Sequence, residues 1–167
     1  MRTLIIDDEE YVRMTLEQAL REEGCQVTAA KNGQQGIDAL QARPFDCVIT
    51  DLRMPGTDGR AVLKWIAEHQ PDVDVIMLTG HGDVKDAVDA IKHGAWDFLV
   101  KETPFDAGVV KAALTKLKTV RALRKENLAA RHGGFTRDVI VEGPSTTWQA
   151  LKARIAHVAP ASAPVLI

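Results

Sequence analysis

The sequence contains no long apolar run, and neither sign of charge is in excess. No apolar stretch approaches the roughly 18 residues that suggest a membrane-spanning helix. Lys and Arg number 21 and Asp and Glu number 23, which gives a formal charge of −2. This balance gives no electrostatic reason to expect nucleic-acid binding by the chain alone. The first ten residues lack the basic, apolar and small-residue sections of a signal peptide, so we expect a cytoplasmic protein without membrane contact.

Cysteine is also scarce. Cys25 and Cys47 are the only two, and they form no CxxC or metal-ligand spacing. Cys47 lies inside the apolar run FDCVIT, where a free thiol behaves as a small hydrophobe. We therefore expect buried, unreactive thiols in a reducing compartment. A length of 167 residues suits one well-buried domain with a tail.

Short apolar runs alternate with amphipathic stretches over residues 1–105. Three of the runs are almost continuously apolar, which is typical of parallel strands covered by helices on both faces. The runs predict strands at residues 3–6, 27–30, 47–50, 75–78 and 98–100. Apolar residues at helical spacing predict helices at residues 10–23, 36–42, 60–69 and 84–93, with Gly24 and Gly94 as C-terminal stops.

Five such β-then-α units predict an α/β fold with a doubly wound, five-stranded parallel sheet and right-handed crossovers. Beyond Pro104, a further helix is predicted over residues 106–131, about twice the average length. It carries four heptad-compatible apolar positions, which are Val109, Ala113, Val120 and Leu123. They favour a short, imperfect coiled coil that pairs two chains. The alternative is a last domain helix with a solvated extension.

Polar side chains that could bind a ligand or take part in a reaction follow the predicted strands. Asp7 and Asp8 follow the first strand, Asp51 the third, Thr79 the fourth and Lys101 the fifth. The carboxyl ends of parallel strands meet at one sheet edge, so these five side chains should converge. Three carboxylates that close together recruit a cation, and an all-oxygen set suits Mg²⁺. The ammonium and hydroxyl suit a phosphoryl group, so the set predicts metal-assisted phosphoryl transfer to Asp51.

Each of these residues also has an ordinary interpretation. An Asp after a strand is usually a turn former or helix cap. A lone Thr there is usually turn chemistry, and a lone Lys is usually solvated. Five of them at four strand ends, in this order, favour the functional interpretation.

Four motifs carry a resemblance to the response-regulator receiver family over residues 1–105. They are IIDDEE at 5–10, DLRMPGTDG at 51–59, LTGHGD at 78–83 and GAWDFLVK at 94–101. The resemblance implies a flavodoxin-like sheet of order 2-1-3-4-5, with an extended C-terminal helix. It also implies that Asp51 accepts a phosphoryl group from a sensor histidine kinase. Such a protein is not a turnover enzyme, because it catalyses its own phosphorylation and dephosphorylation.

The resemblance also implies roles for individual residues. Asp8 and Asp51 would bind Mg²⁺ directly, Asp7 through water, and Arg53 through its backbone carbonyl. The phosphoryl oxygens would be contacted by Thr79 and Lys101. Phe98 lies at the position of a switch aromatic, with plain packing as the alternative, while the side chains of Arg53 and His81 would flank the site. In the family a proline usually follows the lysine directly, whereas here it arrives at Pro104, which leaves the reach of Lys101 open.

The segment after residue 138 resembles the opening of the AAA+ domain of sigma-54-dependent, NtrC-like transcription activators. We expect a receiver domain at 1–118, a linker helix with possible coiled-coil dimerisation at 119–134, and a truncated AAA+ start at 138–167. No Walker A motif is present. The expected partners are the kinase and a second copy of the chain, with DNA and sigma-54 RNA polymerase reached only through missing C-terminal domains.

The sequence also bears on three other classes of protein. A pseudo-receiver would keep the fold as an interaction module without phosphorylation, but the complete acidic set argues against it. A haloacid-dehalogenase-type phosphatase needs an Asp two residues after its nucleophile, and that position is Arg53. A direct DNA-binding protein is disfavoured, because no helix-turn-helix candidate or basic face is present.

Overall fold

The fold was analysed in a computed structural model, which describes residues 1–80 and 84–133. Strands and helices alternate along these residues. The strands are β1 (Arg2–Ile6), β2 (Gln26–Ala30), β3 (Cys47–Asp51), β4 (Asp74–Thr79) and β5 (Asp97–Val100). The helices are α1 (Glu10–Glu22), α2 (Gly33–Ala42), α3 (Gly59–His69), α4 (Val84–Lys92) and α5 (Gly108–Gly133). All ten predicted elements are present, with ends that differ by up to three residues.

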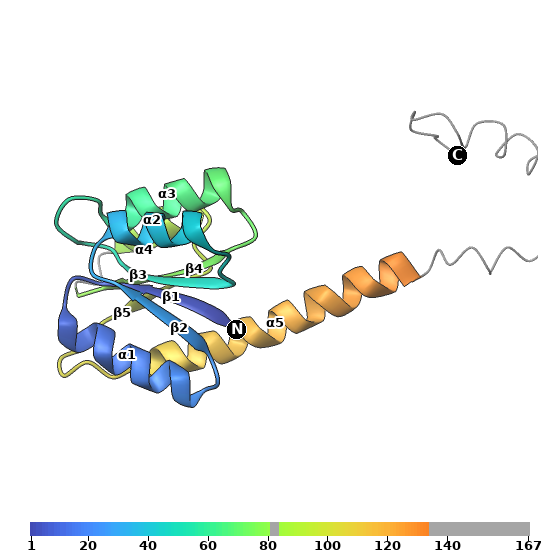
Figure 1. Ribbon diagram of the computed structural model, residues 1–167, viewed down its shortest axis with the longest axis horizontal. Coiled ribbons are helices and arrows are strands. Elements are labelled where there is room, and N and C mark those ends of the chain that lie inside the picture. Colours follow the sequence, from blue (N-terminus) through green and yellow to red (C-terminus); the bar gives the residue numbers. More distant parts are fainter. Residues whose placement is uncertain (81–83, 134–167) are drawn as a thin grey trace, which may run out of the picture. The chain divides into compact units, whose positions relative to one another are not determined.

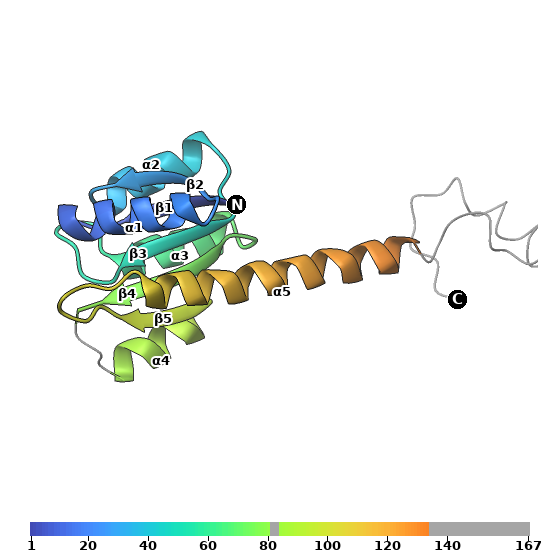
Figure 2. The same ribbon diagram turned by 90° about the horizontal axis from the view of Figure 1, so that it is seen from below.

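The strands form one parallel sheet of order β2-β1-β3-β4-β5, as predicted. Figures 1 and 2 show α1 and α5 on one face of this sheet and α2, α3 and α4 on the other. The order places β1 and β3 in the centre, with the chain winding outward in both directions from them. The carboxyl ends of these strands therefore lie at the point where ligands bind in doubly wound sheets.

Alternate residues of the central strands serve two separate cores. In β1, Leu4 and Ile6 face the core beneath α2, α3 and α4, while Ile5 faces the core beneath α1 and α5. The same alternation continues in β3 and β4. Burial of each such side chain stabilises the fold by about 1.5–3 kcal/mol. Burial on both faces explains why these strands are continuously apolar in sequence.

Local signals fix the helix ends. The side chains of Asn32 and Asp58 accept backbone N–H groups at the starts of α2 and α3. The Asn32 cap explains why α2 begins three residues earlier than its apolar pattern predicts. Gly24 and Gly94 follow α1 and α4 with φ angles of 74° and 96°, a left-handed conformation that favours glycine.

The first half of α5 belongs to the domain core. Its apolar residues recur at helical spacing against the sheet, and the compact unit extends from Met1 to Val120. Ala113 is only 7% exposed and packs in this core, so the predicted coiled-coil seam cannot include it. Val109 and Leu123 are exposed, at 39% and 52%. Pairing of two chains through the later part of α5 stays a prediction.

Both cysteines are free and buried, as expected. Among the described helices, none combines the length and the apolar character that a membrane span requires. His81 and the segment 138–167 lie outside the described residues, so the predictions for them stay predictions.

Candidate functional site

The ends of four neighbouring strands bring the predicted site together. Asp7 follows β1, Asp51 is the last residue of β3, Thr79 is the last residue of β4, and Lys101 follows β5. Parallel register places Thr79 beside Val100, and the backbone N–H of Lys101 donates to the Thr79 carbonyl at 2.7 Å. Asp7, Asp51, Thr79 and Lys101 are all buried. Residues almost a hundred positions apart are thus held at one sheet edge.

The ammonium of Lys101 is the centre of this arrangement. Its nitrogen lies 2.8 Å from Asp51 Oδ2, 2.9 Å from Glu9 Oε1 and 3.1 Å from Asp7 Oδ2. These three carboxylates occupy its three donors. Burial alone would lower the pKa of Lys101, but the hydrogen bonds that it donates to Asp51 and Glu9, together with the negative charges of Asp7 and Asp51, outweigh burial and raise that pKa. Lys101 therefore remains a full positive charge inside the site.

Three carboxylates converge beside this ammonium. Oxygens of Asp7, Asp8 and Asp51 all lie within 4.8 Å of one another. Asp7 is fully buried and Asp51 is 5% exposed, while Asp8 is exposed. Burial raises the pKa of Asp7 to about 6, and Lys101 offsets part of that rise. One ammonium leaves most of this negative charge unbalanced, so the all-oxygen donor set fits a hard divalent cation such as Mg²⁺.

Backbone groups fix the two buried acids. The N–H of Glu9 donates to Asp7 Oδ1 at 2.9 Å, and the N–H of Arg53 donates to Asp51 Oδ1 at 3.3 Å. The start of α3 closes directly on the acceptor, since a Cβ at Gly59 would lie 2.1 Å from the Asp51 carbonyl oxygen. These contacts hold both carboxylates in place before any ligand arrives.

The side chains of the remaining predicted residues contact other parts of the domain. Phe98 is half-buried and packs against the core beneath α2, α3 and α4. The side chain of Arg53 is 67% exposed and contacts Asp86 at 3.4 Å. The cis peptide bond after the lysine lies at Thr103–Pro104. The late proline does not prevent the ammonium of Lys101 from reaching Asp51.

Sequence reasoning missed three residues around the site. Glu9 pairs with Lys101. In the sequence it lies in the acidic run DDEE just before α1, where an acidic side chain is expected only to stabilise the helix through its dipole. Asp86 and Arg60 pair with each other across α4 and α3. The only sequence signal for Asp86 is its place in the first turn of a predicted helix, and Arg60 has none. The contact between the two residues depends on how α3 and α4 pack.

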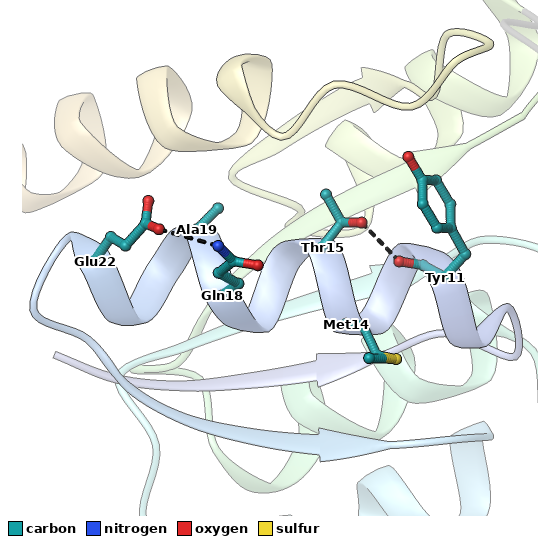
Figure 3. Close-up of a pocket in the computed structure, with 6 residues that line it drawn as sticks. All are labelled: Tyr11, Met14, Thr15, Gln18, Ala19 and Glu22. Carbon is teal, nitrogen blue, oxygen red and sulfur yellow. Dashed lines mark hydrogen bonds between the residues drawn. The ribbon is translucent and has the colours of Figure 1, made fainter.

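A separate hollow lies along α1, outside the acidic site. Its volume is about 420 Å³. Figure 3 shows its six lining residues on this one helix: Tyr11, Met14, Thr15, Gln18, Ala19 and Glu22. Tyr11 and Met14 are unusually exposed for their size, at 64% and 63%. Since α1 begins shortly after Asp7 and Asp8, the exposed pair Tyr11 and Met14 lies in the part of the helix that follows the acidic edge of the sheet.

Comparison with known families decides the assignment. The family described as "Response regulator receiver domain" matches residues 3–115. This chain belongs to that family. The receiver is 35% identical over 141 residues to the DNA-binding transcriptional regulator NtrC of Escherichia coli (strain K12), covering 84% of this chain and 30% of NtrC. It is 35% identical over 173 residues to the C4-dicarboxylate transport transcriptional regulatory protein DctD of Pseudomonas aeruginosa, covering 99% of this chain and 36% of DctD.

Solved receivers agree with the fold. The response regulator TrrA of Thermotoga maritima, in complex with Mg(2+)-BeF, superposes with a TM-score of 0.63 at 30% identity, over 70% of this chain and 97% of TrrA. The beryllofluoride-activated NtrC4 receiver domain dimer superposes with a TM-score of 0.63 at 36% identity, over 71% and 93%. The chain spans about a third of the length of the two curated relatives. It is a response-regulator receiver domain, and it is similar to the matched parts of the transcriptional regulators NtrC and DctD.

Proposed function

We propose that this receiver accepts a phosphoryl group on Asp51 from a sensor histidine kinase, in a reaction that requires Mg²⁺. The observation that carries the proposal is the 2.8 Å contact between Lys101 Nζ and Asp51 Oδ2 inside a buried acidic cluster. A fixed positive charge beside a buried carboxylate is what a nucleophile needs when an anionic group approaches.

Residues of the cluster would hold the metal ion. Asp8, Asp51 and the Arg53 carbonyl would bind Mg²⁺ directly, and Asp7 would bind it through water. The ion would supply positive charge that neutralises the phosphoryl oxygens as the reaction proceeds. The Mg²⁺-containing TrrA complex supports this choice of ion by analogy.

The chain's own residues perform the transfer. A carboxylate oxygen of Asp51 attacks phosphorus, and the bond between phosphorus and the kinase histidine nitrogen breaks. The electron pair of that bond stays on the imidazole. Lys101 transfers one hydrogen bond from Asp51 to a phosphoryl oxygen, and the hydroxyl of Thr79 donates to another.

Hydrolysis reverses the modification. Water attacks phosphorus, Asp51 leaves as a carboxylate, and inorganic phosphate is released. The domain therefore catalyses its own phosphorylation and dephosphorylation and does not turn over a substrate.

Phosphorylation of Asp51 changes the packing of side chains between the site and α4. Thr79 moves toward the phosphoryl group, and Phe98 turns into the space that opens. Phe98 is only half-buried and lies against a core that includes Ala90 of α4, so a change of its rotamer alters the packing of α4. Such a switch needs two pre-existing packings that the phosphoryl group tilts.

The kinase must approach from the acidic edge. The exposed side chains of Tyr11 and Met14 on α1 offer it apolar contact area (Figure 3). Tyr and Met are enriched in the cores of protein interfaces, and Tyr is among the residues that contribute most to binding energy.

The proposal for the linker helix and the C-terminal segment is supported by the relatives. We propose a receiver at 1–118, a linker helix at 119–134 that pairs two chains, and an AAA+ start at 138–167. The dimeric NtrC4 receiver supports pairing by analogy, and the names of NtrC and DctD support transcriptional output. DNA and sigma-54 RNA polymerase would be contacted through C-terminal domains.

Intact-mass measurement tests the acceptor. The protein is incubated with Mg²⁺ and a small phosphodonor such as acetyl phosphate. We expect the wild type to gain one phosphoryl group, Asp51→Asn to gain none, and the exposed control Asp38→Asn to behave as wild type. Phosphate mass on Asp51→Asn, or its absence from the wild type with Mg²⁺ present, overturns the proposal.

A further inference from the structure

Asp86 is an enclosed carboxylate that links three elements. It lies in the first turn of α4, and its side chain is 12% exposed. Two guanidinium groups share its oxygens. Arg53, from the loop after β3, contacts Oδ2 at 3.4 Å, while Arg60, in the first turn of α3, hydrogen-bonds Oδ1. The loop after β3, α3 and α4 thus meet at one acid.

Arg53 connects this cluster to the phosphoryl acceptor. It lies two residues beyond Asp51, and its backbone N–H donates to the Asp51 carboxylate. Its side chain is 67% exposed, so packing does not fix the guanidinium. Moreover, the guanidinium can leave Asp86 without uncovering a buried charge, because Arg60 remains paired with that carboxylate. Of the two arginines, Arg53 is the one that can be released.

We propose that Asp86 is a positioning residue for the phosphorylation site. It holds the Arg53 side chain on α4 while Asp51 is unmodified, and it loses that side chain when Asp51 carries a phosphoryl group. This inference rests on the proposed function. A phosphoryl group adds about −1.5 to −2 charge and strong acceptor oxygens, which match the forked donors of a guanidinium. An ion pair with one largely exposed partner is weak enough to be exchanged for that contact.

The exchange couples the chemistry to α4. Once Arg53 has turned to the phosphoryl group, α4 keeps its tie to α3 through Arg60 and loses its tie to the loop after β3. Coupling between two sites is reciprocal. A partner that draws Asp86 away from Arg53 therefore stabilises the phosphorylated form.

A purely structural role for Asp86 predicts something different. An acidic residue in the first turn favours the helix dipole, and this contribution is independent of Arg53. Under that interpretation Asp86→Asn lowers the stability of the domain but leaves its affinity for a phosphoryl group unchanged. The dependence on Arg53 separates the two interpretations.

The test measures the Kd of beryllofluoride, a phosphoryl mimic, for the full chain with saturating Mg²⁺. We expect Asp86→Asn to bind about two- to fivefold more tightly than wild type, because no exposed ion pair has to be broken. Arg53→Gln should bind about tenfold more weakly, because it loses a charge-assisted hydrogen bond. The double variant should match Arg53→Gln. Asp38→Asn, which replaces an exposed acid on α2, is the control and should match wild type.

Wild-type affinity in Asp86→Asn, or tighter binding that persists without Arg53, overturns the inference. If Asp86→Asn fails to fold, Arg53→Gln alone decides, and wild-type affinity in that exposed variant overturns it. A wild type that takes up neither beryllofluoride nor phosphate contradicts the proposed function itself. A wild type that binds, with no effect of Asp86, contradicts only the role of Asp86.

Discussion

Lys101 Nζ lies 2.8 Å from Asp51 Oδ2, although the two residues are 50 positions apart in the chain. The contact joins the residue after β5 to the last residue of β3, with β4 between them. Both side chains are 7% exposed. A charge-assisted hydrogen bond at this depth is screened little by salt. It fixes the acceptor carboxylate and supplies part of the positive charge that a phosphoryl group will need.

Replacing Lys101 by Gln should change metal binding and phosphorylation in opposite directions. Removal of a positive charge from beside three carboxylates should tighten Mg²⁺ binding about fivefold or more, which corresponds to about 1 kcal/mol of binding free energy. Phosphorylation by acetyl phosphate should fall at least tenfold, because the phosphoryl oxygens lose a charged donor. Calorimetry and intact-mass kinetics measure the two effects. A parallel loss of both would indicate misfolding, which circular dichroism detects.

Glu9 should influence the site more strongly than a neighbouring exposed acid does. It pairs with Lys101 but its side chain is 61% exposed, so Glu9→Gln should weaken Mg²⁺ binding only about two- to fivefold. The matched control is Glu10→Gln, an exposed neighbour that begins α1. Titration of Mg²⁺ at low ionic strength measures both. Equal effects of the two substitutions would show that Glu9 contributes only to the general negative field.

Asp7 should make the metal-free protein less stable as the pH rises. Burial raises its folded-state pKa to about 6 from 3.8, so the folded state binds this proton more tightly than the unfolded state. The destabilisation is absent below about pH 4, develops between pH 4 and 6, and reaches about 3 kcal/mol above that window. Asp7→Asn should remove it. Urea unfolding in EDTA should therefore favour Asp7→Asn at pH 7 but not at pH 4, whereas identical pH profiles would contradict this account.

Two buried threonines on adjacent strands should respond oppositely to valine. The hydroxyl of Thr3 in β1 is buried and has no hydrogen-bond partner among the described residues, whereas that of Thr50 in β3 donates to the Asp51 carbonyl at 3.1 Å. Thr3→Val should raise the free energy of unfolding by about 1 kcal/mol. Thr50→Val should lower it by about 1 kcal/mol. Loss of stability in Thr3→Val, measured by chemical denaturation, would show that this hydroxyl has a partner.

The sheet and the convergence of the acidic site were predictable from sequence. Both depend on the spacing of the apolar residues and on the order of strands and helices along the chain. Continuous apolar strands require two covered faces, and a parallel sheet then brings Asp7, Asp51, Thr79 and Lys101 to one edge. No other contact information was needed for this conclusion. The order of the strands was predicted from the family resemblance and not from the apolar pattern.

Contacts that depend on side-chain reach could not be predicted in this way. Glu9 and Asp86 pair with partners 92 and 26 positions away, and neither spacing has a periodic signal. Ala113 was misassigned because a helix that packs on a sheet and a helix that pairs with another helix share similar apolar spacings. Only the position of the sheet decides which face of α5 is already covered.

Chemical mapping of the modified residue tests the central claim most directly. Borohydride reduces an aspartyl phosphate to homoserine, which peptide mass spectrometry then locates in the sequence. After treatment with Mg²⁺ and acetyl phosphate, we expect homoserine at position 51 and at no other aspartate. Homoserine at Asp7 or Asp8, or phosphate uptake without homoserine at Asp51, would contradict the account.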